Sequence, residues 1–247
     1  MSALDAAYFD QWYADMATSP ARDAILSRTL DVPSSYGLPG VLTGPALDEL
    51  SAALGLPADG LLLDIACGRG GYGIELARRA GSRLIGVDFS AVALSSAVPL
   101  AASRLPGRAS FQVGTLDATG LDSGIADGLM CIDAVQFAAP PLAGLAEFRR
   151  LLKPGGRLVV TCWEGSSADV PARIQAVDLA RDLPLAGFVD VLVEDRPGWR
   201  AAERSLWEEA LAAPPSDPAI VALQDEARSS LATFDVMHRV FATATAP

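Results

Sequence analysis

A glycine-rich segment is the strongest chemical signal in the sequence. The apolar run 61–66, LLLDIA, is typical of a buried strand, and residues 74–77 begin a helical pattern. Glycines between them permit positive φ and let a ligand approach the backbone, while the new helix offers unpaired N–H groups. These glycines are Gly68, Gly70, Gly71 and Gly73. The segment therefore predicts a site for a nucleotide-like ligand.

An acid follows the next apolar run. Asp88 ends RLIGVD at 83–88, roughly 20 residues after the loop, where a carboxylate can accept hydrogen bonds from both hydroxyls of a ribose. Gly68, Gly70 and Gly73 also match the GxGxxG pattern of dinucleotide-binding oxidoreductases. Together these features predict nucleoside binding without choosing the cofactor.

Asp64 favours one class of cofactor. It lies near the end of the predicted first strand, just before the loop, where a diphosphate would meet a repulsive carboxylate and an aminoacyl group would not. Asp64 could also cap the following loop, and the two roles are compatible. An NAD(P)-dependent oxidoreductase would further need a Tyr-Lys or similar pair, but the only lysine, Lys153, is expected in a turn. We therefore rank the oxidoreductase lower.

These residues need an α/β scaffold that brings them together. From residue 46 onward, short apolar runs alternate with helical patterns, which indicates a parallel sheet with helices on both faces. Strands are predicted at 61–66, 83–88, 109–113, 127–132, 156–162, 188–193 and 237–244. Helices are predicted at 46–54, 72–80, 91–104, 141–152, 172–184, 198–212 and 217–232, after two short helices within 3–30.

The motifs in this order resemble the class I S-adenosylmethionine-dependent methyltransferases of the small-molecule type, similar to those of ubiquinone and menaquinone biosynthesis. The first motif of that family is an acid and a glycine-rich loop, here DIACGRG from Asp64. The resemblance continues through GVDFS at 86–90, ADGLMCIDAVQF at 126–137 and EFRRLLKPGGRLVVTCWE at 147–164. It covers residues 46–195.

The resemblance implies a Rossmann-like, seven-stranded, mostly parallel sheet with an antiparallel last strand and an N-terminal helical cap. We expect one methyltransferase domain with a cap at 1–45, a cofactor-binding core at 46–195, and a helical insertion and last strand at 196–247. The implied activity is in-line methyl transfer from S-adenosyl-L-methionine to a small organic molecule, such as a secondary metabolite, leaving S-adenosyl-L-homocysteine. A non-methylating protein on this scaffold, a cyclisation catalyst or a cofactor-binding regulatory partner, stays open.

The resemblance also assigns cofactor contacts. Asp64 and the loop amides would hold the methionyl end, and Asp88 the ribose. The predicted cofactor set is Asp64, Ala66, Gly68, Gly70, Asp88, Phe89, Thr115, Leu116, Asp117, Asp133 and Gln136.

Two positions depart from the family pattern. Ala66 replaces the first glycine of the loop, so we expect an ordinary φ and a narrower approach there. Thr115 stands where the family has an acid after the third strand. The adenine contact therefore stays open among Thr115, Leu116 and Asp117.

Aromatic residues before the core predict a cover over the acceptor. By resemblance, residues 3–20 and 197–233 form a mobile cover, although the aromatics could instead be the apolar face of a packed helix. The expected acceptor-binding residues are Tyr8, Trp12, Tyr13, Gln136, Phe137 and Trp163.

Few side chains in the sequence are candidates for a general base. The sequence shows neither a Ser-His-Asp set nor metal-site spacing among its three cysteines, which argues against hydrolases and predicts no metal. Either the acceptor ionises easily, as a phenol, enol, carboxylate or amine does, or a side chain removes its proton. The candidate bases are Asp133, Tyr13, His238 and Glu164.

The net charge and the pattern of apolar residues limit which partners the protein can bind. A formal charge of -11 without a basic stripe argues against nucleic acid. The first residues lack a signal-peptide pattern, and no run approaches the roughly 18 apolar residues of a membrane helix. With an odd number of cysteines, we expect a cytoplasmic protein without a membrane partner, acting on a small-molecule acceptor. A homodimer stays open.

Overall fold

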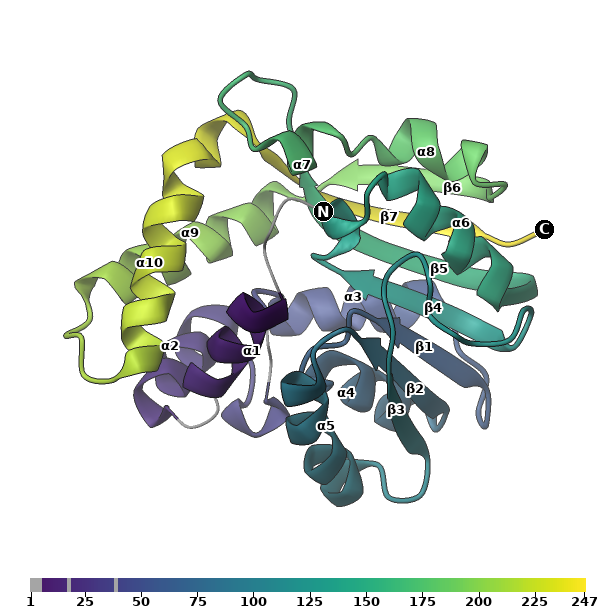
Figure 1. The fold of residues 1–247 in the computed structure, drawn as a ribbon, viewed down its shortest axis with the longest axis horizontal. Coiled ribbons are helices and arrows are strands. Elements are labelled where there is room, and N and C mark those ends of the chain that lie inside the picture. Colours follow the sequence, from purple (N-terminus) through teal and green to yellow (C-terminus); the bar gives the residue numbers. More distant parts are fainter. Residues whose placement is uncertain (1–5, 17–18, 38–39) are drawn as a thin grey trace.

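The computed structural model describes residues 6–16, 19–37 and 40–247, which form a seven-stranded sheet (Figure 1). The strand order is β3-β2-β1-β4-β5-β7-β6. Neighbours from β3 to β5 are parallel, and β7 is antiparallel to both β5 and β6. The strands are β1 (Leu61–Ile65), β2 (Arg83–Asp88), β3 (Ala109–Val113), β4 (Ala126–Ile132), β5 (Leu152–Glu164), β6 (Val189–Asp195) and β7 (His238–Thr245). The predicted sheet with an antiparallel last strand is confirmed.

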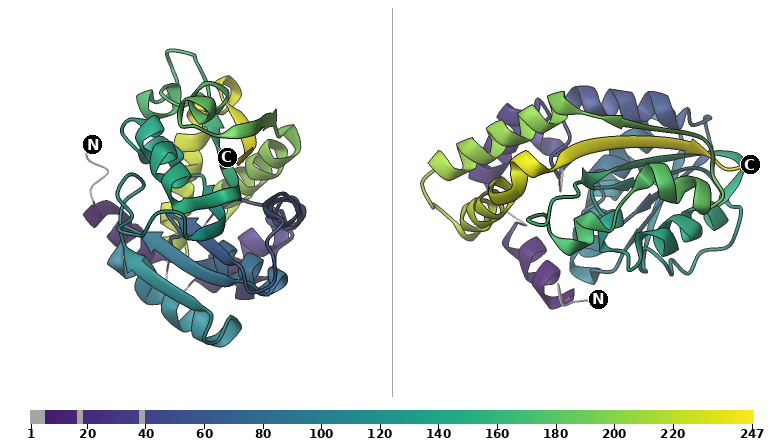
Figure 2. Two further views of the ribbon diagram at one scale, coloured as in Figure 1. Left: turned by 90° about the vertical axis from the view of Figure 1, so that its right-hand side faces the viewer. Right: turned by 90° about the horizontal axis from the view of Figure 1, so that it is seen from above.

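Helices cover both faces of this sheet, as the two views of Figure 2 show. They are α1 (Ala6–Asp15), α2 (Pro20–Leu30), α3 (Gly44–Leu54), α4 (Gly71–Ala80), α5 (Ala91–Arg104), α6 (Pro141–Leu151), α7 (Ala172–Gln175), α8 (Leu179–Leu185), α9 (Pro197–Ala212) and α10 (Pro218–Thr233). Successive strand residues point to opposite faces. Leu62 and Met130 thus belong to the core under α3, α4 and α9, whereas Leu63 and Leu129 belong to the core under α6 and α8.

Local capping explains where several helices begin. Ser19 caps α2 by accepting a hydrogen bond from the Arg22 N–H, with Pro20 in the first turn. The single helix predicted at 172–184 is wrong, because the chain forms α7 and α8 separately. Asp178 accepts a hydrogen bond from the Arg181 N–H and so starts a new helix at residue 179.

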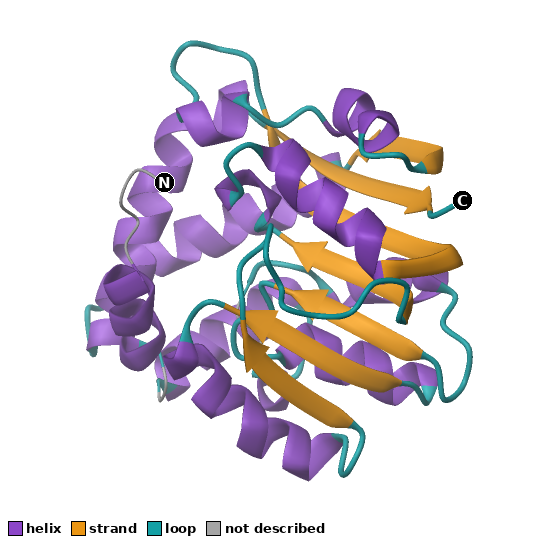
Figure 3. Ribbon diagram, turned by 45° about the vertical axis from the view of Figure 1, so that its right-hand side comes forward, coloured by secondary structure: helices purple, strands orange, loops and turns teal. Residues whose placement is uncertain are grey.

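Four helices gather beyond the carboxyl ends of the parallel strands, toward which the arrowheads in Figure 3 point. These are α1, α2, α9 and α10 (Figure 1). Arg28 on α2 pairs with Glu209 on α9. The Ser19 hydroxyl, before α2, donates to Asp217, before α10, at 2.9 Å. The N-terminal helices therefore pack against the insertion between β6 and β7. Within the described ranges, no helix is long and apolar enough to span a bilayer.

Candidate cofactor and acceptor site

The sheet changes its direction of growth between β1 and β4, and open α/β sheets bind ligands at such a point. The residues that follow these two strands, Ala66 and Asp133, have φ values of 60° and 56°. Non-glycine residues rarely adopt this left-handed region, and they cluster at functional sites when they do. The ordinary φ predicted for Ala66 is therefore wrong: the chain turns left-handed there even without glycine.

The glycine loop and Asp88 are joined by backbone hydrogen bonds. The Gly68 N–H donates to Asp88 Oδ2 at 2.7 Å, and the Ser90 N–H donates to Oδ1 at 2.9 Å. Asp88 is buried, and burial raises the pKa of its carboxyl while these N–H donors oppose the rise. The Phe89 N–H also bonds to this carboxyl, and since a carboxylate offers about four lone pairs, acceptor capacity remains for a ligand hydroxyl. The loop thus fixes the carboxylate predicted to hold a ribose.

Asp64 lies against the first turn of α4. A Cβ added at Gly73 would lie 2.5 Å from Asp64 Oδ2, so only glycine lets the helix approach this carboxyl. Burial, with a further contribution from the charge of Asp88, raises the pKa of Asp64 to about 8. The Gly73 N–H, which bonds to the carboxyl, opposes this rise. Asp64 therefore lies against the first turn of α4, and no cation among the described residues contributes to the shift of its pKa.

The segment after β3 places its three predicted residues differently. Thr115 and Asp117 are exposed, and the Thr115 hydroxyl donates to Asp117 Oδ1 at 2.8 Å. Leu116 is half-buried and packs toward the core under α6. The preceding Gly114 N–H donates to the Asp88 carbonyl at 3.1 Å, which ties this segment to the ribose acid.

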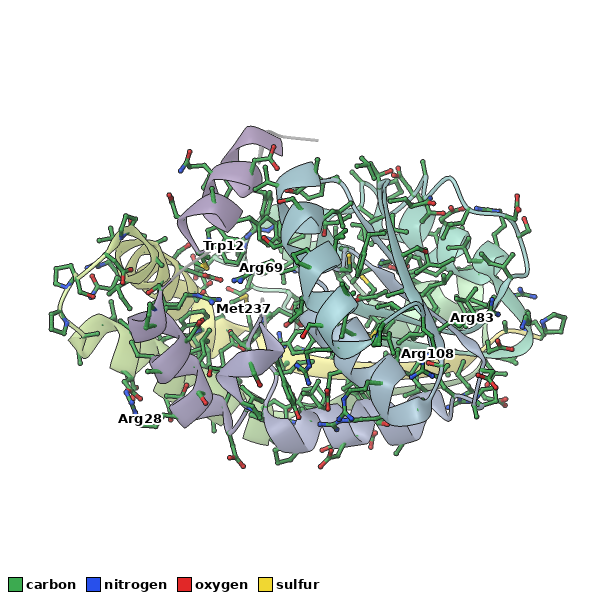
Figure 4. All side chains as sticks on the ribbon, turned by 90° about the horizontal axis from the view of Figure 1, so that it is seen from below. Trp12, Arg28, Arg69, Arg83, Arg108 and Met237 are labelled. Carbon is green, nitrogen blue, oxygen red and sulfur yellow. The ribbon has the colours of Figure 1, made fainter. Side chains whose placement is uncertain are left out.

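Helix α1 lies directly over the glycine loop. A Cβ at Gly68 would lie 2.7 Å from the Tyr13 hydroxyl oxygen, and Arg69 donates to the Met16 carbonyl at 3.2 Å. Figure 4 labels Trp12 and Arg69 where α1 meets the loop. The predicted cover thus reaches the cofactor loop. The part of the cover at residues 3–5 and 17–18 lies outside the described residues.

Aromatic packing on α1 differs from the predicted wall. Tyr8 is 54% exposed and contacts Phe9 edge-on. Phe9, absent from the predicted set, packs edge-on against Phe89 and Phe137 with ring centroids 5.4 and 5.7 Å apart. Phe9 therefore links the cofactor segment to the acceptor segment. Trp12 and Tyr13 follow Phe9 at i+3 and i+4, so the sequence could have placed Phe9 on the same helix face as these two residues.

The segment after β4 contains residues that the sequence predicted to bind the acceptor. Gln136, in the short 3-10 helix η2 (Val135–Phe137), is buried, and its Nε2 donates to the Asp133 carbonyl at 2.7 Å. Its Oε1 has no hydrogen-bond partner among the described residues. Trp163, at the end of β5, is buried against Phe234 with ring centroids 5.2 Å apart. Trp163 and Gln136 thus lie at the carboxyl ends of two neighbouring strands, β5 and β4.

Asp133 is bound on both oxygens. Thr161 Oγ1 donates to Oδ1 at 2.7 Å, and Arg239 Nη2 donates to Oδ2 at 2.5 Å. Both carboxyl oxygens therefore already accept hydrogen bonds from side chains of the protein. The structure therefore favours a positioning role for Asp133 over its predicted role as base.

The other predicted bases differ in environment. Burial, together with the charge of Asp88, raises the pKa of the Tyr13 hydroxyl, so it stays protonated at neutral pH. His238 Nε2 lies 4.0 Å from Glu164 Oε2 at the paired ends of β7 and β5, with its side chain 52% exposed. Burial raises the pKa of Glu164. His238 is thus the candidate with the most solvent access.

The sequence interpretation missed two charged residues on the acceptor side. Arg239 is only 1% exposed and pairs with Asp133. Glu203, on α9, is buried with its Oε2 3.8 Å from Arg239 Nε. A single charge inside the apolar strand RVFATA was a signal for Arg239. Glu203 lies on an amphipathic helix, where its burial had no local signal.

Comparison with known proteins agrees with this geometry. Residues 62–156 match the family model described as a methyltransferase domain. A ubiquinone/menaquinone biosynthesis C-methyltransferase of Geobacter sulfurreducens is 30% identical over 132 residues, 52% of this chain and 51% of that protein. The chloroplastic tocopherol O-methyltransferase of Arabidopsis thaliana is 30% identical over 103 residues, 41% of this chain and 30% of that protein. The chain thus spans about half the length, or less, of these curated relatives.

Solved structures share the fold at lower identity. Phosphoethanolamine N-methyltransferase 2 of Haemonchus contortus, in complex with S-adenosyl-L-methionine, aligns with a TM-score of 0.74 at 18% identity, covering 96% of this chain and 60% of that one. The cyclase SpnF aligns with a TM-score of 0.70 at 21% identity, covering 93% of this chain and 98% of that one. Residues 62–156 thus match a methyltransferase domain, and the fold and the order of the motifs are similar to those of class I S-adenosylmethionine-dependent methyltransferases.

Proposed function

We propose that the protein transfers the methyl group of S-adenosyl-L-methionine to a small organic acceptor, leaving S-adenosyl-L-homocysteine. One observation carries the proposal: Asp64, the glycine loop and Asp88 converge beside the switch point between β1 and β4. When bound, the cofactor supplies a methyl group already activated by a sulfonium.

The residues around the loop fit this cofactor. Asp64 is a buried acid whose pKa is raised by burial and by the charge of Asp88, and an ammonium group of the methionyl end would stabilise its ionised form. Asp88 keeps acceptor capacity for a ribose hydroxyl beyond its backbone hydrogen bonds. A diphosphate beside these two acids would be repelled. The fit supports an aminoacyl nucleoside over a dinucleotide.

On the acceptor side, the chain's task is to orient a nucleophile and exclude water. Helix α1 covers the loop through Tyr13, and Phe9 connects Phe89 with Phe137. We propose that Trp12, Gln136 and Trp163 complete the acceptor wall and that Tyr8 lies at its rim. Within this account, His238 remains a candidate base at the outer edge.

We further propose a secondary metabolite as acceptor, because the site pairs aromatic walls with a sparse supply of bases. An acceptor whose hydroxyl ionises readily needs no strong base from the protein. The domain division at residues 45 and 195 is part of the same proposal, with the N-terminal helices and the α9–α10 insertion acting together as a cover.

A methylation screen tests the activity. The full chain is incubated with methyl-labelled S-adenosyl-L-methionine and sets of phenolic, polyketide-like and amine metabolites, and products are detected by mass. We expect label in members of one set and formation of S-adenosyl-L-homocysteine. Tight cofactor binding without labelled product in any set would instead favour a non-methylating role on this scaffold.

A further inference from the structure

A buried charged cluster lies beside the proposed acceptor wall, and two of its three members, Glu203 and Arg239, belong neither to the predicted cofactor contacts nor to the candidate bases. It joins Asp133 after β4, Glu203 on α9 and Arg239 on β7. These residues are far apart in sequence, and the fold brings them to the carboxyl ends of β4 and β5. The Arg239 guanidinium also lies 5.5 Å from the Trp163 ring centroid. The cluster therefore borders the aromatic wall proposed for the acceptor.

The cluster is incompletely paired. Arg239 uses Nη2 on Asp133 at 2.5 Å, but its Nη1 has no hydrogen-bond partner among the described residues. Glu203 Oε1 accepts from Trp207 Nε1 at 3.2 Å, while Glu203 Oε2 likewise lacks a partner there. A buried polar atom without a partner costs about 1–3 kcal/mol, so proteins keep such atoms where a ligand completes them.

The protonation of the cluster defines the missing partner. Burial raises the pKa of Glu203 to about 8; Arg239 opposes the rise, and Asp133 and Glu226 add to it. Tyr72 on α4 and Cys162 on β5 also face the cluster, and burial raises the pKa of each, so both are neutral at pH 7. Arg239 pairs with Asp133 through Nη2 alone. At neutral pH the two unmet groups, Arg239 Nη1–H and the Glu203 carboxyl O–H, are thus both donors.

Two buried donors beside an aromatic wall require an acceptor oxygen on a flat ligand. We propose that Arg239 and Glu203 bind the oxygen of a phenol or enol as its anion, and that this oxyanion is the methyl acceptor or is conjugated to the acceptor carbon. The inference rests on the proposed methyl transfer and names its substrate class. An amine would instead bring a cation to a cationic donor, which disfavours it.

The step balances without a base in the site. The phenol or enol loses its proton to solvent when it binds, because Arg239 favours the anion. A bond then forms between the methyl carbon and the ligand oxygen or its conjugated carbon, and the carbon–sulfur bond breaks. The electron pair goes to sulfur, so the negative ligand and the positive sulfonium become a neutral product and a neutral thioether. When carbon is the acceptor, the ring or enol carbon that receives the methyl group then loses its proton to solvent, and the oxygen takes one up from solvent, which restores a neutral phenol or enol.

The test uses 4-nitrophenol as the probe, because its anion absorbs visible light. The full chain is saturated with S-adenosyl-L-homocysteine and titrated with 4-nitrophenol between pH 5 and 8. We expect the midpoint of ionisation to fall by about 1 to 3 pH units on binding, as an adjacent cation produces. Arg239→Gln should abolish the fall, and Arg239→Lys should restore part of it.

Matched variants separate binding from folding. Glu203→Leu should weaken 4-nitrophenol binding more than Glu203→Gln, which keeps a donor in place. Arg204→Gln, on the same helix but in an exposed pair with Asp235, should behave as wild type. Thermal stabilisation by S-adenosyl-L-homocysteine is measured for every variant and reports a folded cofactor site.

The outcomes are distinct. If S-adenosyl-L-homocysteine does not bind the wild type, the proposed methyl transfer itself fails. If it binds but 4-nitrophenol does not bind at millimolar concentration, or 4-nitrobenzylamine binds as well as 4-nitrophenol does, this inference is overturned. If the midpoint of ionisation falls as far on binding to Arg239→Gln as on binding to the wild type, the inference is overturned as well.

Discussion

Two acids at the same edge of the sheet, one on each side of β1, are held in different ways. Asp88 accepts hydrogen bonds from the backbone of Gly68 and Ser90, close to it in the chain or across one loop. Asp133 accepts from the side chains of Thr161 and Arg239, the latter 106 residues away. The cofactor half therefore depends on backbone geometry, and the acceptor half on side chains from separate elements.

This difference has a functional consequence. The backbone donors around Asp88 stay in place when neighbouring side chains are substituted, so this half can keep binding the same cofactor. A half built from side chains on α9 and β7 can change its ligand through a few substitutions. We therefore expect variants of the first half to affect cofactor affinity and variants of the second to affect acceptor binding.

The largest expected effect on the cofactor half comes from Asp88→Ala. Loss of hydrogen bonds to a charged group should weaken S-adenosyl-L-homocysteine binding by about 1.5–3 kcal/mol, or roughly 10- to 150-fold. Calorimetric titration measures it. The exposed Asp122→Ala variant serves as the control and should bind normally. Unchanged affinity in folded Asp88→Ala protein would remove Asp88 from the site.

Gly73→Ala tests the close approach of α4 to Asp64. The added Cβ would lie 2.5 Å from Asp64 Oδ2, so the carboxyl or the helix must shift, at about 1–3 kcal/mol of folding stability. Denaturant unfolding provides the measurement. Gly198→Ala, where the Cβ meets nothing within 4 Å, is the matched control and should leave stability unchanged or slightly higher. Equal stabilities for the two variants would contradict the packing described for Asp64.

A smaller effect is expected in pH dependence. The pKa of Asp64 is about 8 in the folded protein against an ordinary 3.8, so the cofactor-free fold binds a proton that the unfolded chain has lost between these values. Its contribution to stability thus falls as pH rises from about 4 to 8. Pairing with an ammonium group requires the ionised form, so cofactor affinity should rise between pH 6 and 7.5, by at most about tenfold per pH unit.

Asp64→Asn separates this effect from others. The variant should bind S-adenosyl-L-homocysteine more weakly and lose the rise in affinity with pH, and its cofactor-free form should lose less stability toward pH 8. Titrations at several pH values measure the first, and thermal unfolding measures the second. A wild-type affinity that is flat from pH 6 to 7.5 would contradict the assignment of Asp64 to the ammonium end.

The same contrast explains what could be predicted from the sequence. Strand ends at Asp64 and Asp88 follow from local patterns, because loop, strand and helix signals are contiguous. The left-handed φ at Ala66 was missed, because alanine gives no local sign of it. Arg239 and Glu203 meet only through tertiary packing of β7 and α9, which periodicity does not specify.

The central claim is that the chain binds an aminoacyl nucleoside and not a dinucleotide. Thermal unfolding of the full chain with S-adenosyl-L-homocysteine or with NAD tests it most directly. At a concentration of about 100 times its Kd, a ligand that binds only the folded state stabilises it by about 2.7 kcal/mol. We predict that S-adenosyl-L-homocysteine raises the Tm and that NAD leaves it unchanged. A raised Tm with NAD alone would contradict the account.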